Sequence, residues 1–323
     1  MKKEKSKALI LLERFKMFIL LVVVLAVLGI VEPKFLAGNN IANIFKQIAT
    51  NAILAAGMCF VILTGGIDIS VGATLALVGA ISVDLIRMGV HIVFVVLIAL
   101  AIGAVVGLFN GVFIAKFKLQ PMIVTLATMS ICRGLTYIYT KGSPITLNTA
   151  LSSGKVYKWI GSGSLFDKIP FPLILVILVF AVSFYILNKT AFGRRVYAVG
   201  GNEDAARLSG INTVWTKIMA YVTCGIMAAI AAIIISARVS SAQPNAGESY
   251  EMDAIAAVVI GGTSLRGGEG KVLYTIIGAL IIGMLNNFLN LIGVDSYYQI
   301  VVKGVVILIA VLADAKTEKS RVK

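Results

Sequence analysis

Residues 92–115 read IVFVVLIALAIGAVVGLFNGVFIA, an apolar stretch of 24 residues without a charged side chain. A helix of about 20 apolar residues crosses the hydrocarbon core of a bilayer, so this segment predicts a membrane-spanning helix. Similar apolar runs recur along nearly the whole chain of 323 residues, of which 59% are hydrophobic and 14% charged. Soluble domains carry about 25% charged residues. The sequence therefore predicts an all-α polytopic protein of a cell membrane rather than a soluble domain with one anchor.

Ten segments are candidate spans, and together they predict a single transmembrane domain over residues 1–323 with its membrane core at 15–313. They lie near 15–31, 43–63, 71–87, 92–115, 121–140, 171–188, 214–236, 252–263, 272–292 and 297–313. The segment 252–263 is too short to cross alone, and 71–87 is marginal. Because both lie beside glycine-rich breaks, we expect discontinuous or re-entrant helices near 64–72 and 252–270.

The placement of basic residues predicts the orientation in the membrane. With the N-terminus inside and ten crossings, the cytoplasmic segments hold 19 Lys and Arg and the outer segments hold 7. Cytoplasmic loops of membrane proteins are enriched in Lys and Arg, so both termini are expected in the cytoplasm. The same rule explains the net charge of +14. Nucleic acid is not expected as a partner, because the sequence shows no basic helix or aromatic platform.

Metal, disulfide and nucleotide chemistry have little support in the sequence. The three cysteines form no Cys-x-x-Cys pair and His91 is the single histidine, so neither a metal site nor a disulfide framework is expected. No GxxxxGK[ST] motif occurs. The nearest stretch, GGEGKV at 267–272, has Leu265 at the first glycine position and Val272 where a hydroxyl would bind magnesium. We therefore expect no enzyme activity and no cofactor in this chain.

The polar stretch GNEDAARLSGI, residues 201–211, lies between two apolar segments. Asn202 suits an N-cap, and Glu203 and Asp204 place negative charge in the first turn. Gly210 suits the left-handed position that ends a helix. These residues predict a helix of about two turns, which is marginal in isolation and needs a partner to hold it. From these residues alone, an ordinary solvated loop is the alternative.

Paired alanines followed by a glycine and an apolar residue make this stretch resemble the cytoplasmic loop of membrane subunits of ATP-binding-cassette (ABC) importers. Five further segments resemble the ribose-type branch of that family, so the likeness covers about residues 15–315. They are LTGGIDISVGA (63–73), KGSPI (141–145), ARVSSAQPNAG (237–247), DAIAAVVIGGTSLRGGEG (253–270) and SYYQIVVKGVVILIAV (296–311). The resemblance implies a permease subunit that forms the path for a monosaccharide, with ribose as the first candidate.

The resemblance also implies partners. A separate cytoplasmic ATPase, which carries ATP and magnesium, is expected to dock on a coupling helix in the loop 189–213. The residues implied in docking are Gly201, Asn202, Glu203, Asp204, Ala205, Ala206, Arg207, Gly210 and Ile211. An extracellular or periplasmic sugar-binding protein is expected to deliver the solute near 141–170, and a second permease, identical or homologous, completes the path in the lipid bilayer. An ion-coupled secondary transporter or facilitator is the alternative.

Polar residues within apolar segments predict a translocation path or gate. The candidates are Gly65, Gly66, Asp68, Ser70, Asn110, Asn286, Asn287 and Asn290. A break at TGGIDIS (64–70) exposes backbone groups that must be buried in protein or line water. For Asp68 itself, capping of the next helix is the alternative. Asn286 and Asn290 share one helix face, where they either join helices by hydrogen bonds or meet a hydroxylated solute.

A weak internal echo indicates a repeat, which transporters often place around their path. Gly65-Gly66 and Gly72 recur as Gly261-Gly262 and Gly268, Gly107 and Asn110 recur as Gly283 and Asn286, and Arg133-Gly134 recurs as Lys303-Gly304. With ten spans, the first of these echoes keeps its direction and the others invert. The symmetry of the repeat therefore stays open at the level of sequence.

Overall fold

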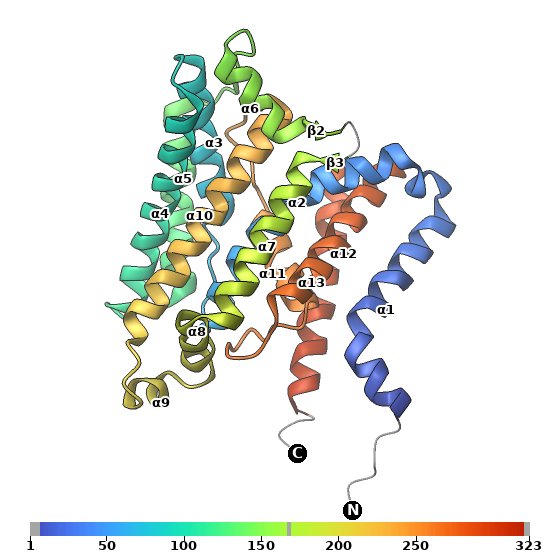
Figure 1. Cartoon of the computed structure of the whole chain (residues 1–323), viewed down its shortest axis with the longest axis vertical. Coiled ribbons are helices and arrows are strands. Elements are labelled where there is room, and N and C mark those ends of the chain that lie inside the picture. Colours follow the sequence, from blue (N-terminus) through green and yellow to red (C-terminus); the bar gives the residue numbers. More distant parts are fainter. Residues whose placement is uncertain (1–6, 167–168, 320–323) are drawn as a thin grey trace, which may run out of the picture.

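The computed structural model describes residues 7–166 and 169–319, and regular structure there is almost entirely helical (Figure 1). The helices are α1 (Lys7–Val31), η1 (Pro33–Leu36, a 3₁₀ helix), α2 (Gly38–Leu63), α3 (Val71–Arg87), α4 (Ile92–Ala115), α5 (Pro121–Thr140), α6 (Ser152–Ser162), α7 (Phe171–Lys189), α8 (Ala191–Gly201), α9 (Glu203–Leu208), α10 (Thr213–Val239), α11 (Tyr250–Ile260), α12 (Val272–Leu291) and α13 (Ser296–Lys319). The predicted cytoplasmic ends, residues 1–6 and 320–323, lie outside the described residues.

Four two-residue strands form two small antiparallel pairs between loops. β1 (Ile145–Thr146) pairs with β4 (Ser241–Ala242), and β2 (Ser164–Leu165) pairs with β3 (Ile169–Pro170). The first pair joins the segment after α5 to the segment after α10, nearly 100 residues later in the chain.

Six helices in the described residues are long and apolar enough to span a membrane: α2, α4, α5, α7, α10 and α12. Shorter apolar stretches are Met17–Val31 in α1 and Tyr297–Ile309 in α13. The outer helices expose large apolar side chains, for example Ile30 at 80% and Ile138 at 76%. Extended apolar surface of this kind marks contact with lipid or another protein. The all-α polytopic membrane fold is therefore confirmed.

The centre of the bundle is α10, which contacts α2, α3, α4 and α6. Glycines bring α4 against it. A Cβ on Gly103 would lie 2.3 Å from the carbonyl oxygen of Gly225, and Gly111 meets Ile218 in the same way. Small residues allow this close backbone approach within a membrane, where helices associate by packing. Because the residue numbers of the two helices run in opposite order along the contact, α4 and α10 are antiparallel.

We name the two ends of the bundle by the helices that cover them. The α9 end carries α8 and α9, together with the start of α1 and the end of α13, and lies at the bottom of Figure 1. The α6 end, at the top of Figure 1, carries α6. α2 ends at the α9 end, because the amide of Gly268 donates to the carbonyl of Leu63 (3.0 Å) and Gly200 of α8 packs on the same carbonyl.

Two passes of the chain through the bundle combine irregular chain with a short helix. In the first interrupted pass, residues 64–87, the chain leaves α2 at the α9 end, runs without helix over 64–70 and continues as α3. In the second interrupted pass, residues 240–260, the chain leaves α10 at the α6 end, runs irregularly through β4 to residue 249 and continues as α11. Their starting points lie at opposite ends of the bundle.

The first interruption lies where the sequence predicts it, near 64–72, but the second does not. Helix α11 occupies most of the first half of the predicted interval 252–270, and irregular chain lies on both sides of it, at 240–249 and 261–271. The prediction took the glycine pair at 261–262 as the break. The helix is interrupted earlier, around Pro244 and Gly247, where a proline removes a backbone donor and the glycine has a φ of 73°.

The repeat that relates α4 to α12 is inverted. α4 runs toward the α9 end, because it is antiparallel to α10, which leaves that end after α9. α12 follows the loop 261–271 at the α9 end and therefore runs away from it. The echo of glycine and asparagine between these two helices thus joins oppositely directed elements. The glycine pairs at 65–66 and 261–262 both lie at the α9 end, so they are not part of this inverted repeat.

Candidate functional site

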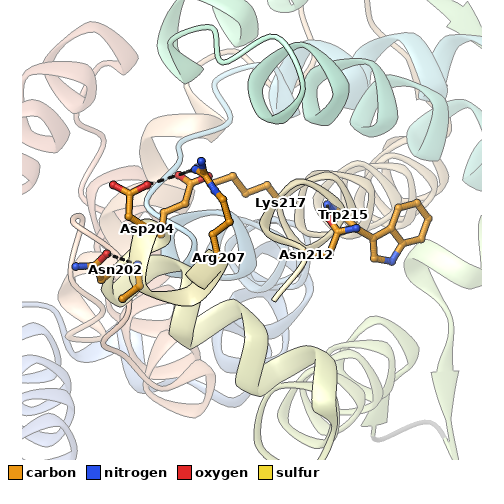
Figure 2. Close-up of polar contacts among 8 residues, drawn as sticks. Asn202, Asp204, Arg207, Asn212, Trp215 and Lys217 are labelled. Atoms are coloured by element: carbon orange, nitrogen blue, oxygen red, sulfur yellow. Dashed lines mark hydrogen bonds and ion pairs between the residues drawn. The ribbon is translucent and has the colours of Figure 1, made fainter. Parts of the chain in front are cut away.

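Within the stretch 201–211, Glu203–Leu208 form one short helix, α9, which lies between the two caps that the sequence predicts. Figure 2 shows the N-terminal cap, Asn202. The Asn202 side chain accepts a hydrogen bond from the amide of Ala205 at 2.9 Å. At the other end Gly210 has a φ of 82°, and its amide donates to the carbonyl of Arg207 at 3.0 Å. A left-handed residue costs little only for glycine, so Gly210 defines where the helix ends.

Charged side chains hold α9 against α10. The ammonium of Lys217 donates to Glu203. Partial burial of Glu203 is the largest single effect and disfavours its ionised form. The hydrogen bond and charge of Lys217, with smaller contributions from Thr213 and Arg207, together outweigh it, so the pKa of Glu203 lies below its usual value. Arg207 lies 3.4 Å from Asp204 and 3.9 Å from Glu203 (Figure 2). Arg207, one of the residues implied in docking, is therefore engaged in ion pairs within α9.

The two alanines of α9 do not form one docking face. Ala206 is buried against its own chain, whereas Ala205 is exposed. Neighbouring residues on a helix point to different sides, so a flat face made of both alanines is not available. Gly201 is exposed at the end of α8, and Ile211 is half-buried and donates its amide to the Ala206 carbonyl at 3.0 Å.

Two exposed apolar residues beside α9 were missed by sequence reasoning. Leu208 is 90% exposed, the largest exposed fraction among the large apolar side chains described. Trp215, at the start of α10, is 54% exposed, and its amide donates to the capping side chain of Asn212 at 2.9 Å (Figure 2). An apolar side chain in an otherwise polar, capped segment was the signal that could have identified Leu208. Both residues place large apolar side chains on the surface of the α9 end.

α8 connects α9 to the interrupted passes through backbone contacts. A Cβ on Gly200 would lie 1.8 Å from the carbonyl oxygen of Leu63, where the first interrupted pass begins. It would also lie 2.4 Å from the amide nitrogen of Gly268, in the loop that follows α11. The Tyr197 hydroxyl donates to the carbonyl of Gly270 in that loop at 3.0 Å. We call this contact between α2, α8 and the loop 261–271 the glycine junction.

Asp68, Ser70 and Asn110 form a buried cluster with Thr128. The amide and hydroxyl of Ser70 donate to Asp68 Oδ1 at 3.0 and 2.6 Å. The Asn110 amide donates to the Ser70 hydroxyl at 2.9 Å, and the Thr128 hydroxyl donates to Asn110 Oδ1 at 2.6 Å. These bonds fasten the irregular chain 64–70 to α4 and α5. Asp68 binds the amide of Ser70, which precedes α3, and the first turn of α3 receives no side-chain cap. Asp68 therefore orders the irregular chain instead of capping the helix.

Gly65 and Gly66 serve the turn that starts the first interrupted pass. Gly65 has a φ of 79°. Gly66 lies against Tyr221, since a Cβ there would be 2.4 Å from the tyrosine oxygen. The Tyr221 hydroxyl donates to the carbonyl of Ile67 at 3.3 Å. These contacts pack Gly66 and Ile67 against α10 at the α9 end, while Gly65 stays exposed.

A second buried cluster surrounds Asp253, which sequence reasoning did not select. Asp253 Oδ2 accepts from Asn51 at 3.1 Å, from Asn286 at 3.2 Å and from the ammonium of Lys303 at 3.0 Å. The cluster joins α2, α11, α12 and α13. An acidic residue inside an apolar segment was the signal that could have identified it.

The other asparagines of α12 also link helices. Asn287 and Asn40 exchange two amide hydrogen bonds at 2.9 and 3.2 Å. Asn290 accepts from the side chain of Gln299 at 2.9 Å. Since Asn286, Asn287 and Asn290 each bond to a different element, the structure favours the interpretation that they hold helices together.

The comparisons with known proteins agree over almost the whole chain. The family model described as branched-chain amino acid transport system / permease component matches residues 40–311. The ribose import permease protein RbsC of Bacillus subtilis (strain 168) is 51% identical over 299 residues, which are 93% of this chain and 92% of that protein. RbsC of Escherichia coli (strain K12) is 49% identical over 304 residues, 94% of each chain.

More distant relatives carry other sugar names. The L-arabinose transport system permease protein AraH of Escherichia coli (strain K12) is 36% identical over 310 residues, 96% of this chain and 92% of that protein. No solved structure matches the chain. With a family model over residues 40–311 and relatives about half identical over nearly their full length, the chain belongs to the branched-chain amino acid transport system / permease component family, within the group that contains the ribose import permeases, and is a multi-pass membrane protein.

Proposed function

We propose that this protein is the membrane-spanning permease of an ATP-driven ABC importer for ribose. The observation that carries the proposal is the identity of 49–51% to ribose import permeases over more than 90% of both chains, against 34–36% to the allose and arabinose permeases. The family description names branched-chain amino acids, but the most similar of the relatives compared carry ribose in their names.

The chain crosses the bilayer ten times in this proposal, with both ends in the cytoplasm. Eight crossings are the long helices α1, α2, α4, α5, α7, α10, α12 and α13, and two are the interrupted passes. The α9 end is then cytoplasmic, as the excess of basic residues in its loops favours. Because the three cysteines are buried, single introduced cysteines can test this. In intact cells an impermeant thiol reagent should label Lys155→Cys on α6 and spare Asp204→Cys on α9, and the reverse would overturn the orientation.

α9 provides the docking element for a separate ATPase in this proposal. Three features support it. The capped helix α9 lies at the end of the bundle that is proposed to be cytoplasmic, Leu208 is 90% exposed, and the glycine junction connects α8 to both interrupted passes. A buried apolar side chain at the centre of a contact commonly dominates binding energy. Movement of α9 on the ATPase reaches the membrane through α8. At the opposite end, α6 and the loops 141–170 receive a sugar-binding protein, and a second permease completes the path.

The docking proposal is tested with Leu208→Asp, which removes the exposed apolar contact. The matched control is Met88→Asp, directly after α3 at the α6 end and outside the loops 141–170, where the side chain is 66% exposed. We expect a P-loop ATPase to co-purify with the wild type and with the control variant but not with Leu208→Asp, and ribose uptake into cells to fall in parallel. Ribose movement down its gradient in liposomes without an ATPase would overturn the importer.

A further inference from the structure

The irregular segment 243–249 starts directly after β4 at the α6 end and reaches deep into the membrane-spanning part of the protein near Gly247. A Cβ on Gly72 would lie 2.2 Å from the carbonyl oxygen of Gly247. Gly72 precedes Arg87, the last residue of α3, by 15 residues, which is about 22 Å along the helix axis. Arg133 donates to the carbonyls of Pro244 (2.7 Å) and Ala246 (2.8 Å) from the middle of α5. The hydrocarbon core of a bilayer is about 30 Å thick, so the part of the segment around Gly247 lies within it, while Gln243 lies nearer the α6 end.

Three polar side chains of this segment are exposed and lack hydrogen-bond partners among the described residues. Gln243, Asn245 and Glu248 are all exposed, and their side chains make no hydrogen bond to any described residue. Exposed polar groups at this depth are costly against lipid, and irregular backbone is tolerated there only when it is buried in protein or lines a water-filled space. The segment therefore faces water inside the membrane.

A cavity of about 330 Å³ adjoins the segment. It is bounded by α3, by the last turns of α10 and by residues 241–250. This volume is near the lower end of the range for small-molecule pockets, about 300–1,000 Å³. Its apolar side includes Leu75, Ile235 and Val239.

The chemistry of the lining suits a neutral solute rich in hydroxyl groups. The amides of Gln243 and Asn245 offer donors and acceptors, and the carboxylate of Glu248 offers acceptors. The charge of Glu248 is opposed by Arg238, whose guanidinium also lines the cavity and is anchored by the carbonyl of Lys46 at 2.9 Å. The cavity thus carries no net charge from its lining. By contrast, the Asn286 and Asn287 amides already donate to protein groups.

We propose that this cavity binds the transported monosaccharide during its passage, with Gln243, Asn245 and Glu248 as contacts for its hydroxyl groups. The proposal rests on the proposed sugar import and adds a site within it. Contacts by exposed side chains at the rim of an open cavity are weak, as rapid release of a passing solute requires.

The first experiment measures flux in the reconstituted importer with its ATPase and binding protein. The variant combines Gln243→Met with Asn245→Leu, which keep side-chain volume and remove hydrogen-bonding groups. The control is Asn39→Leu, an exposed asparagine at the α6 end and away from the cavity. We expect ribose moved per ATP hydrolysed to fall about tenfold in the double variant. ATP hydrolysis stimulated by the binding protein should stay unchanged, as should both readouts in the control. Wild-type flux in the double variant would overturn the site.

The second experiment reports on the cavity independently of flux. Asn245→Cys is labelled with a small maleimide, which is selective because the native cysteines are buried. We expect ribose at millimolar concentration to slow the labelling, and a sugar acid of similar size to have no effect. Labelling that no monosaccharide slows would overturn the cavity. Failure of the wild type to move ribose, with labelling still slowed by a sugar, would overturn the proposed substrate alone and support the site.

Discussion

The two interrupted passes share a design and differ in their surroundings. Each runs as irregular chain and then as a short helix, and each carries a buried acid bound by an asparagine of the next helix. Asn110 lies 3.3 Å from Asp68, and Asn286 lies 3.2 Å from Asp253. Only the second acid has a cation among its described contacts, Lys303. The irregular chain of the first pass is closed by Tyr221 and the glycine junction, whereas that of the second borders a cavity.

The two passes run in opposite directions, and this difference indicates different roles for them. The first pass holds the fold in place, and the second borders the proposed path of the solute. In the first pass the polar groups that interrupt the helix are satisfied by the protein, so the chain is held in one arrangement. In the second pass the acid is fixed by three partners at the start of α11, while the polar residues before it stay free to meet solute. Matched substitutions in the two passes should therefore lower the stability of the fold by unequal amounts.

The largest effect is expected where the comparison finds a buried ion pair. Lys303→Met leaves Asp253, which is 2% exposed by side chain, without its cation. Removing one partner of a buried pair costs about 3–5 kcal/mol, because the other charge stays uncompensated. We expect this variant to have a lower melting temperature than any other matched substitution in the two passes, measured in detergent by the fluorescence of Trp159 and Trp215.

The double variant Asp253→Asn with Lys303→Met is the control for this ion pair. It removes both charges and keeps the hydrogen-bonding shape at position 253, so we expect it to recover most of the lost stability. If the double variant were as unstable as Lys303→Met, packing by the lysine side chain rather than its charge would explain the loss of stability. The ion pair would then not account for a difference in stability between the two passes.

The sequence predicts the local features of these passes better than their partners. Asn202 and Gly210 define α9 correctly, because capping depends on neighbouring residues. The break at 64–70 follows from adjacent glycines and polar residues. The partners of Asp253 could not be predicted, because Asn51 and Lys303 lie 202 and 50 residues away and no local pattern specifies such contacts. The burial of Ala206 likewise depends on tertiary packing. The interruption around Pro244 was missed because the glycine pair at 261–262 is the stronger local signal for a break.

An intermediate effect is expected at the glycine junction, which both passes share. Gly200→Ala places a Cβ against the backbone of Leu63 and Gly268, and backbone atoms cannot move aside as a flexible side chain can. Overpacking of this kind costs about 1–3 kcal/mol. Gly201→Ala on the same helix is the matched control, since a Cβ there meets nothing within 4 Å. The control should melt close to the wild type, and equal losses in both variants would show that the junction is not tight.

The smallest effect is expected at Asp68, the acid without a cation among its described contacts. Asp68→Asn keeps an oxygen that can accept from the amide and hydroxyl of Ser70, and it leaves no opposite charge unpaired. A substitution that preserves shape and acceptor should cost less than about 1 kcal/mol. Asp253→Asn is the matched change in the other pass, and we expect it to lower the melting temperature more, because it strands the Lys303 ammonium. If Asp68→Asn were as damaging as Lys303→Met, the carboxylate charge at position 68 would be required in its own right. The first interrupted pass would then have a role beyond holding the fold in place, and the proposed difference in role between the two passes would be wrong.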